Sequence, residues 1–256
     1  MPRFDTLATP ILIGLCSTLL VSSPARAQST EWSDRAFVNV NLGYQLTARP
    51  FEEQLAPVIY SERALIGVAH PGDGGKLTLD LGGGVHLWKN LGVGGAFTKF
   101  AATETPTVNA RIPNPAFFNQ PRAASKAAPF QRAESAIHIQ ALYVVPVTSR
   151  IDVALSGGPS LIDVQQDFVQ SIEVAEAGPP FTTVAIGNVL LLTRDVRAFG
   201  FNAGADVTWF VTPLVGVGVT ARYVRGSVTT PLSDGSPIDL VVGGFQVGLG
   251  ARIRLR

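Results

Sequence analysis

Apolar and polar residues alternate along much of this chain, most clearly between Phe245 and Leu255. Phenylalanine, valine, leucine, alanine and isoleucine fill every second position of this segment, and glutamine, glycine and arginine fill the positions between. Successive side chains of a β-strand point to opposite faces, so the pattern predicts a strand with one apolar and one polar face. The same alternation recurs around residues 37–45, 77–87, 91–98, 134–145, 151–156, 199–209 and 215–223. The sequence therefore predicts an all-β protein with eight such strands.

The composition excludes several classes of protein. Only 15% of the residues are charged, against about 25% in typical soluble domains, while 46% are hydrophobic. The apolar residues are scattered, which excludes a bundle of membrane helices with about 20 consecutive apolar residues each. High apolar content and a net charge of +1 exclude a disordered chain and a nucleic-acid-binding protein held by a basic field.

The first 27 residues have the three parts of a secretory signal peptide. Arg3 gives a positive start, residues 7–21 are apolar, and Ala25-Arg26-Ala27 is a cleavage site of small residues. We expect cleavage after Ala27, which leaves residues 28–256 as the mature chain with no net charge. An uncleaved anchor helix is the alternative, but the apolar stretch is short for a membrane span and contains Pro10. The single cysteine, Cys16, leaves with the signal peptide, so the mature chain can form no disulfide.

Short and long connections alternate between the predicted strands. Lys89-Asn90, Thr148-Ser149 and Thr212-Pro213 are tight turns, whereas the other connections span roughly residues 48–75, 104–132, 169–195 and 230–237. Outer-membrane β-barrels show this asymmetry, with short periplasmic turns and long extracellular loops. Residues 57–68 could form a further strand, but a ninth strand would put the two termini on opposite sides of the membrane. We therefore assign this segment to an extended first hairpin above the membrane and expect eight barrel strands.

These features together resemble those of a known group of proteins. The signal peptide, the eight alternating strands, the aromatic residues near strand ends and the final Gly-x-Gly-x-Arg-x-Arg segment (248–254) look like the small outer-membrane barrels of the OmpA and OmpW type. The resemblance covers about residues 36–256, and the chain differs from the group in ending with Leu255-Arg256 instead of an aromatic residue. It implies a closed, antiparallel, up-and-down transmembrane β-barrel in the bacterial outer membrane, formed by residues 28–256.

The polar face of the predicted strands carries both carboxylates and arginines. An arginine facing lipid at the bilayer midplane would cost about 2–4 kcal/mol, whereas charges inside a barrel can pair with one another. We therefore expect the apolar faces to point outward and a polar network to fill the lumen. Its predicted members are Asp80, His86, Glu134, His138, Gln140, Asp152, Asn202, Asp206, Arg222, Arg252 and Arg254. Trp88, Tyr143, Trp209 and Phe210 lie near the tight turns, where an aromatic belt facing lipid is expected.

Alternation alone does not decide which face of the strands is buried. A secreted soluble β-barrel with its apolar face inward, binding a small apolar ligand, would show the same periodicity. The loop asymmetry, the signal peptide and the shortage of charge favour the membrane barrel. With eight strands and arginine and phenylalanine side chains inside, we expect a lumen that is blocked to everything except water or small ions.

The second long connection is basic and aromatic. Residues 106–132 contain no acidic residue, and such a loop would suit lipopolysaccharide phosphates or an extracellular ligand. The candidate contact residues are Arg111, Phe117, Phe118, Arg122, Lys126 and Arg132. The alternative is a loop rich in proline and alanine that folds over the barrel mouth. The connection 169–195 is expected to be a protruding hairpin, whose edges would bind a partner by strand addition.

Catalytic and metal-binding patterns are sparse. His86 and His138 share the polar face, so a metal pair and a hydrogen-bonded polar interior are both open interpretations. Lipid A deacylases of the outer membrane use a His-x-Ser pair on one strand, but Trp88 and Gln140 occupy the positions two residues after these histidines. Omptin-type proteases pair Asp with His, and His138 with the nearby carboxylates leaves a general acid/base site as an alternative. We expect no catalytic residue, no metal and no cofactor.

The predicted function is that of a non-enzymatic integral outer-membrane protein with a structural, adhesive or narrow-conduit role. Its expected partners are outer-membrane lipid and lipopolysaccharide, an extracellular ligand at the long loops, and no nucleic acid. We expect a monomer. The soluble ligand-binding barrel and, less favoured, a barrel enzyme acting on outer-membrane lipid remain as alternatives.

Overall fold

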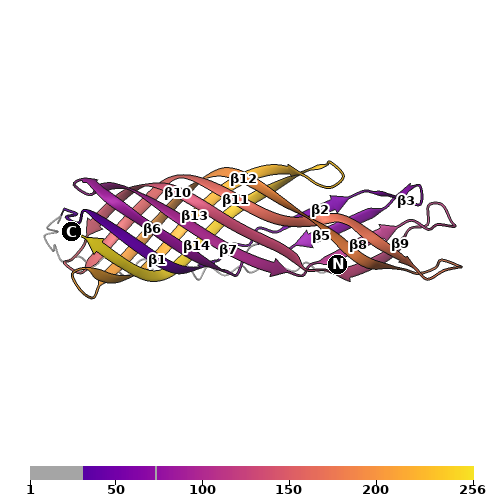
Figure 1. Cartoon of the computed structure of the whole chain (residues 1–256), viewed down its shortest axis with the longest axis horizontal. Coiled ribbons are helices and arrows are strands. Elements are labelled where there is room, and N and C mark those ends of the chain that lie inside the picture. Colours follow the sequence, from indigo (N-terminus) through magenta and orange to yellow (C-terminus); the bar gives the residue numbers. More distant parts are fainter. Residues whose placement is uncertain (1–30, 73) are drawn as a thin grey trace, which may run out of the picture.

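The computed structural model describes residues 31–72 and 74–256, and the predicted signal peptide lies outside them. Eight strands form one closed antiparallel barrel, in the order β1-β14-β13-β12-β11-β10-β7-β6 (Figure 1). The barrel strands are β1 (Ala36–Gln45), β6 (Lys76–Trp88), β7 (Leu91–Glu104), β10 (Phe130–Pro146), β11 (Ile151–Glu176), β12 (Val184–Phe210), β13 (Val215–Pro231) and β14 (Pro237–Leu255). The predicted fold class and the number of barrel strands are therefore confirmed. Within the described ranges, no helix is long and apolar enough to span a membrane.

The ring closes through β1, which pairs with the last strand and with β6. Ala36 lies opposite Leu255 on β14 and opposite Val85 on β6. The two-residue turn at Lys89-Asn90 and the turns at 147–150 and 211–214 lie at this same end of the barrel. The three predicted tight turns thus lie at one end of the barrel and the four other connections between barrel strands lie at the other end, as the alternation of connection lengths predicted.

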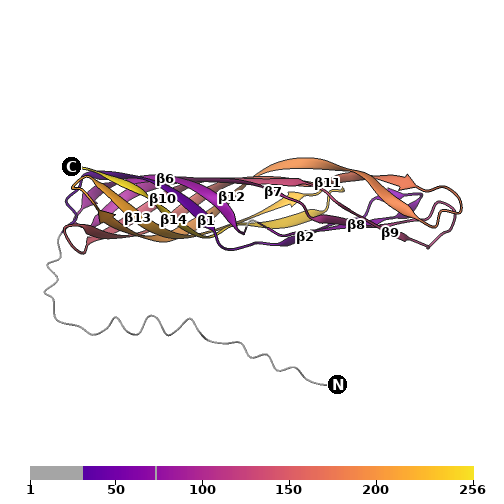
Figure 2. The same cartoon turned by 90° about the horizontal axis from the view of Figure 1, so that it is seen from below.

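Beyond the barrel, the long connections build a second layer of structure, which we call the extension. It comprises the outer parts of β11 and β12 and a four-stranded sheet in the order β2-β5-β8-β9 (Figures 1 and 2). The added strands are β2 (Phe51–Leu55), β5 (Leu65–His70), β8 (Thr107–Ile112) and β9 (Arg122–Ala127), and β3 (Val58–Ile59) pairs with β4 (Glu62–Arg63) in a small hairpin. The assignment of 57–68 to the first hairpin above the membrane is consistent with these strands.

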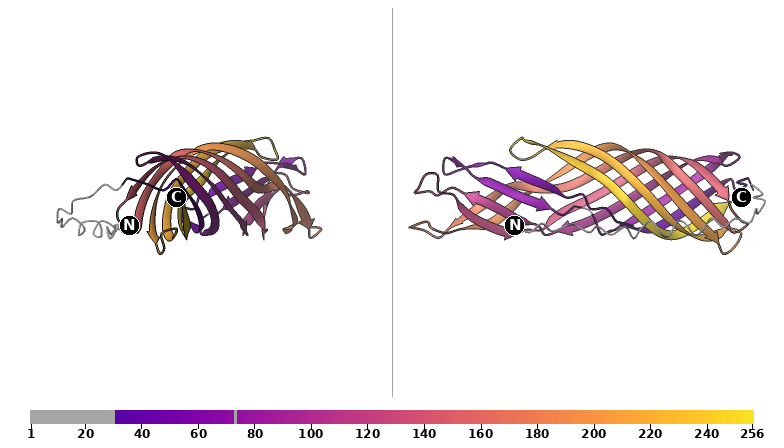
Figure 3. Two further views of the ribbon diagram at one scale, coloured as in Figure 1. Left: turned by 60° about the vertical axis from the view of Figure 1, so that its left-hand side comes forward. Right: turned by 180° about the vertical axis from the view of Figure 1, so that it is seen from behind.

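The structure corrects the interpretation of residues 106–132 as a loop folded over the barrel mouth. Val108, Ala110 and Ile112 alternate with exposed residues and turn their side chains into an apolar core, so this segment forms strands β8 and β9. The 169–195 segment is a protruding hairpin, as expected, because β11 and β12 stay paired from the barrel up to Glu176 and Val184. Figure 3 shows this long ribbon from two further sides.

The barrel and the extension bury opposite kinds of side chain. The barrel exposes apolar residues on its outer wall, among them Val40, Leu79, Ile139, Val207 and Leu249, and turns polar residues inward. The extension buries an apolar core that includes Ile66, Val108, Ile112, Phe130 and Phe168. The four-stranded sheet therefore packs against β11 and β12 as the two layers of a soluble domain do.

A small apolar cluster closes the barrel at the end with the tight turns. Trp32 folds under the barrel and is buried with Phe37, Leu142, Val144 and Ala154. Phe210, predicted to face lipid, is instead 2% exposed, because it occupies an inward position of β12. Its neighbour Trp209 faces outward with Trp88 and Tyr143, and these three form the aromatic belt.

Candidate functional site

The middle of the barrel holds the first group of predicted interior residues. Arg222 on β13 donates to one carboxylate oxygen of Asp80 on β6 across 2.5 Å, and Asn41 on β1 donates to the other across 2.7 Å. All three side chains are buried. A buried ion pair with its remaining lone pairs bonded is the arrangement that makes charges tolerable in an interior.

His138 lies beside this pair and is fully buried. Its Nδ1 is 2.7 Å from Ser160 Oγ, and its Nε2 is 3.1 Å from Thr98 Oγ1. Asn202 donates to Ser160 Oγ, and Gln140 donates to Asn202 Oδ1 across 2.8 Å. The histidine is therefore a member of a hydrogen-bonded interior network.

A second ionic group lies nearer the tight-turn end. Arg252 forms an ion pair with Asp206, and Arg254 donates a hydrogen bond to Asp152 across 2.7 Å and forms an ion pair with Asp34 at 2.9 Å. The guanidinium groups also stack on aromatic rings, Arg252 over Phe37 and Arg254 over Phe210. Asp34 was missed in the sequence because it precedes the first alternating segment.

Two predicted members lie apart from this interior network. His86 contacts the carbonyl of Lys89 and the ring of Trp32 at the tight-turn end, because the strand bulges after it. Glu134 pairs with Arg132 at the opposite end, next to the extension. The structure does not bring His86 and His138 together, so they form no metal pair.

The interior around these groups is filled. The cavity lined by Asn39, Gln140, Arg222 and Arg252 measures about 30 Å³, and one lined by Phe100, Ile162 and Gln246 measures about 10 Å³. Spaces of this size hold about one or two water molecules. Apolar residues then cover the network on both sides, the Trp32 cluster below and the core of the extension above.

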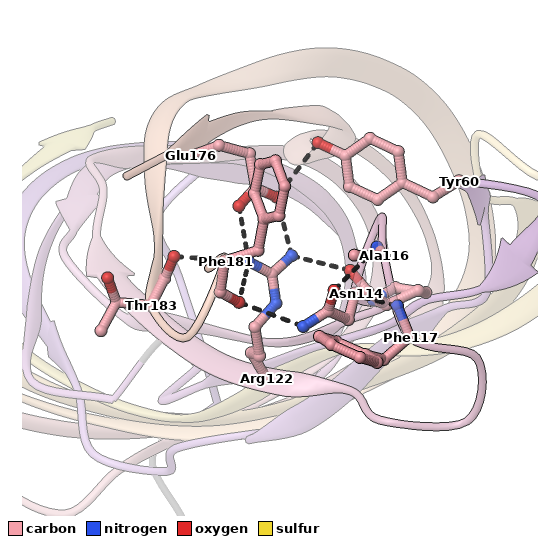
Figure 4. Close-up of polar contacts among 9 residues, drawn as sticks. Tyr60, Asn114, Ala116, Phe117, Arg122, Glu176, Phe181 and Thr183 are labelled. Carbon is pink, nitrogen blue, oxygen red and sulfur yellow. Dashed lines mark hydrogen bonds and ion pairs between the residues drawn. The ribbon is translucent and has the colours of Figure 1, made fainter. Parts of the chain in front are cut away.

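The distal end of the extension holds a second polar group, built around Arg122 on β9 (Figure 4). Its guanidinium forms a bidentate ion pair with the Glu176 carboxylate at the end of β11, with hydrogen bonds of 2.5 and 2.7 Å. It also donates to the backbone carbonyls of Pro113, Phe181 and Thr183. One side chain thus joins the β8–β9 connection to the β11–β12 connection.

The charges of this pair shift each other's protonation. The hydrogen bonds from Arg122 hold the pKa of Glu176 below its ordinary value. The same hydrogen bonds to Glu176 raise the pKa of Arg122. Tyr60, at the turn between β3 and β4, donates its hydroxyl to Glu176 across 3.1 Å. Partial burial is the main cause that raises the pKa of Tyr60, and the hydrogen bond to the Glu176 carboxylate is the second.

Two aromatic side chains project from the structure fixed by Arg122, and with Tyr60 and Val58 they make what we call the tip. Phe117 and Phe118 are 51% and 76% exposed. Their loop is held by Asn114, whose side-chain oxygen accepts the amides of Ala116 and Phe117 and whose amide donates to Phe181 O (Figure 4).

Three of the cations predicted to contact a ligand already bind groups of the protein itself. The prediction that these three contact a ligand is therefore corrected. Arg122 holds Glu176, and Lys126 donates to the carbonyl of Gly187 on β12. Arg132 is 2% exposed and pairs with Glu134. Glu176 and the carbonyl of Gly187 come from distant strands, and Glu134 lies just beyond the segment on β10, so the absence of acidic residues in 106–132 did not reveal these partners. Arg111, Phe117 and Phe118 are exposed, as a ligand contact requires.

A buried pair in the extension was also missed in the sequence. His70 Nε2 lies 3.0 Å from Glu53 Oε2, and the other oxygen of Glu53 accepts the amide of Val169. The ring of His70 stacks on Phe51 at 4.3 Å between centroids. Glu104 lies near enough to His70 to interact with it electrostatically, and burial raises the pKa of Glu104. These residues join β2, β5, β7 and β11 at the base of the extension.

No family model matches this sequence, and neither does any curated protein. Solved structures with a similar fold include the outer membrane protein OprG from Pseudomonas aeruginosa, with a TM-score of 0.48 and 9% identity over 88% of this chain and 97% of that one. Ail, the attachment invasion locus protein of Yersinia pestis, gives 0.41 and 9% over 88% and 100%. The outer membrane protease OmpT from Escherichia coli gives 0.43 and 8% over 88% and 98%. The closed ring of eight antiparallel strands itself agrees with the predicted resemblance to small outer-membrane barrels, for the fold alone.

The outer wall of the barrel identifies its surroundings. Every barrel strand is paired on both sides, so the ring leaves no open sheet edge where it would contact lipid. Its outward side chains are apolar on all eight strands, with the aromatic belt at the tight-turn end. Closed barrels with such a surface are integral proteins of the bacterial outer membrane, and this chain is one of them.

Proposed function

We propose that this protein is a non-enzymatic, adhesive surface protein, in which the barrel anchors an extension that binds an extracellular partner at the tip. The observation that carries the proposal is the exposure of Phe117 and Phe118 on a loop held by the hydrogen bonds of Asn114 and Arg122. Exposed aromatic side chains contribute much of the energy of protein interfaces, and fixed ones lose little entropy on binding. The apolar tip would suit a partner protein with an apolar patch.

The filled interior supports an anchoring role over a conduit. Buried ion pairs such as Asp80–Arg222 cross the lumen, and the two small cavities inside the barrel hold only water-sized molecules. A solute crossing the barrel would have to break these pairs and displace the core of the extension. We expect planar bilayers containing the protein to show no steady large conductance, and a steady large conductance would contradict this part of the proposal.

The geometry gives less support to the two alternatives. A soluble barrel with an apolar ligand cavity would need apolar side chains inside the ring, where this barrel has Asp80, His138 and Arg222. An enzyme using His138 would need a path for substrate, yet this side chain is fully buried between Thr98 and Ser160. We expect His138→Ala to lower the stability of the barrel. We expect it to leave any cleavage of lipid or peptide by the preparation unchanged.

The adhesive role can be tested on whole cells. A non-adherent bacterial host would express the protein, and attached cells would be counted on surfaces coated with fibronectin, collagen or fixed epithelial cells. We expect attachment above the empty host, and loss of most of it in the Phe117→Ser/Phe118→Ser double variant. Leu190→Ser is the matched control, since Leu190 is an exposed apolar residue on β12. Attachment unchanged by the double variant, or no attachment to any of these surfaces, would contradict the proposal.

A further inference from the structure

The outward face of the four-stranded sheet carries a groove of about 680 Å³, on the side away from the core of the extension. This volume lies in the range of ligand-binding sites. Its polar outward side chains are Glu52, Gln54, Asn109, Arg111 and Ser125. Gly67 adds an outward position without a side chain. The groove is open at the surface, so an extended molecule can lie along it.

The strand register explains why this face is hollow and where its hydrogen-bonding groups lie. Gln54 lies opposite Gly67, Gly67 opposite Asn109, and Asn109 opposite Ser125, so these four form one row across the whole sheet. A Cβ atom added to Gly67 would meet no atom within 4 Å. The row therefore places two amides and a hydroxyl around an empty centre.

The rows on either side supply small residues and two charges. Glu52 lies opposite Ala69 on one side of the central row. Arg111 lies between Leu65 and Ala123 on the other. The carboxylate and the guanidinium thus lie at opposite ends of the groove, and Leu65 is the one large apolar side chain among its outward residues. The lining therefore combines hydrogen-bonding groups with apolar surface, and it suits a ligand that has both.

We propose that this groove binds an acidic oligosaccharide, with a carboxylate of the sugar at Arg111. Amide side chains donate and accept hydrogen bonds, and the serine hydroxyl does both, which matches the hydroxyl groups along a sugar chain. The guanidinium can bind a carboxylate through two parallel hydrogen bonds. Glu52 at the far end disfavours a second acidic group there, so the site selects one acidic sugar next to Arg111. The site is independent of the tip.

Binding would be measured by calorimetry on the full chain in detergent, with an acidic hexamer of five neutral xylose units and one terminal glucuronic acid, and with the neutral hexamer xylohexaose. We expect saturable binding that is tighter for the acidic hexamer. Asn109→Ala and Gln54→Ala should each weaken it by about fivefold, the effect of one lost hydrogen bond. Arg111→Gln should remove the preference for the acidic hexamer. Gly67→Leu should block binding of both, because its side chain fills the groove without removing a contact.

The matched control is Thr107→Ala, an outward residue of β8 that does not line the groove. Each variant should keep the heat-shifted mobility of a folded barrel on unboiled gels. Absence of saturable binding to either hexamer in the parent protein would overturn the proposal, as would affinities that Asn109→Ala and Gly67→Leu leave unchanged. Equal affinity of the parent for the two hexamers would overturn the role of Arg111. None of these results bears on attachment through Phe117 and Phe118.

Discussion

The barrel and the extension share strands yet follow opposite rules of burial, and β11 shows this within one continuous element. In the barrel its inward side chains are polar, as at Asp152 and Ser160. In the extension most inward side chains of the same series of even-numbered positions are apolar: Ile162, Val164 and Phe168, with the polar Gln166 among them. The backbone does not change face between these sets. The surroundings change, from lipid outside the lower part to water outside the upper part.

The outer wall marks the boundary between the two regions within a single step of the register. One row across four strands consists of Phe97, Ile137, Leu161 and Phe199. The next row toward the extension consists of Lys99, Ser135, Asp163 and Arg197. Hydrophobic burial therefore stabilises the two regions in different ways: the lower part puts its apolar side chains into the bilayer, whereas the upper part needs a core of its own.

The largest expected effect comes from truncating the core of the extension. Phe168→Ala should cost about 3–5 kcal/mol in the stability of the extension, because Phe168 is fully buried there. Hydrogen exchange should show loss of protection in β2, β5 and β8 while the barrel strands stay protected. Phe199→Ala is the matched control, since this 80% exposed ring faces lipid. Equal loss of protection in both regions would contradict their separate stabilisation.

Breaking an ion pair of the barrel should have the converse effect. Arg222→Ala leaves the carboxylate of Asp80 buried without its cation, and removal of one partner of such a pair costs about 3–5 kcal/mol. Urea titration of the heat-shifted band should show the loss. The double variant Asp80→Leu/Arg222→Met should recover much of it, because it removes both charges. A double variant as unstable as the single one would show that the volume of these side chains matters more than their charges.

A charge on the outer wall should distinguish the two regions on one strand. Val219→Arg places a guanidinium against lipid and should cost about 2–4 kcal/mol, whereas Ser227→Arg on the same face of β13 should cost almost nothing. Urea titration of folded barrels in lipid vesicles would compare them. Similar costs at the two positions would mean that the lipid boundary does not lie between them.

The smallest expected effect is the pH dependence of the tip. Arg122 lowers the pKa of Glu176 in the folded protein, so this pair stabilises the tip at pH above the ordinary glutamate pKa. The stabilisation should disappear as the pH falls through the lowered pKa. Hydrogen exchange of the Ala116 and Phe117 amides, compared between pH 7 and pH 3, should show faster opening at low pH after correction for intrinsic rates. Glu176→Gln should remove this difference, and its persistence would assign it to another group.

The two regions also differ in how much of each could be predicted from sequence. Alternation with apolar residues outward predicted the eight strands, the closed barrel and the inward position of Asp80, His138 and Arg222. The sequence showed clear alternation only over 151–156 and placed the next connection at 169–195, whereas β11 and β12 stay paired up to Glu176 and Val184. The apolar residues move to the other face at Ile162, where lipid gives way to water. The folded arrangement decides the rest: Arg122 meets Glu176 only because the β8–β9 and β11–β12 connections lie side by side, and Arg132 and Glu134 pair because both side chains of β10 point inward.

The boundary between the two regions can be tested by single cysteines, since Cys16 in the predicted signal peptide is the only cysteine of the chain. Arg197→Cys and Phe199→Cys place thiols two residues apart on the outward face of β12. A membrane-impermeant maleimide applied to intact cells should label Cys at position 197 and leave position 199 unlabelled until the membrane is dissolved and the protein denatured. Equal labelling of both positions in intact cells would contradict the membrane barrel with a water-exposed extension.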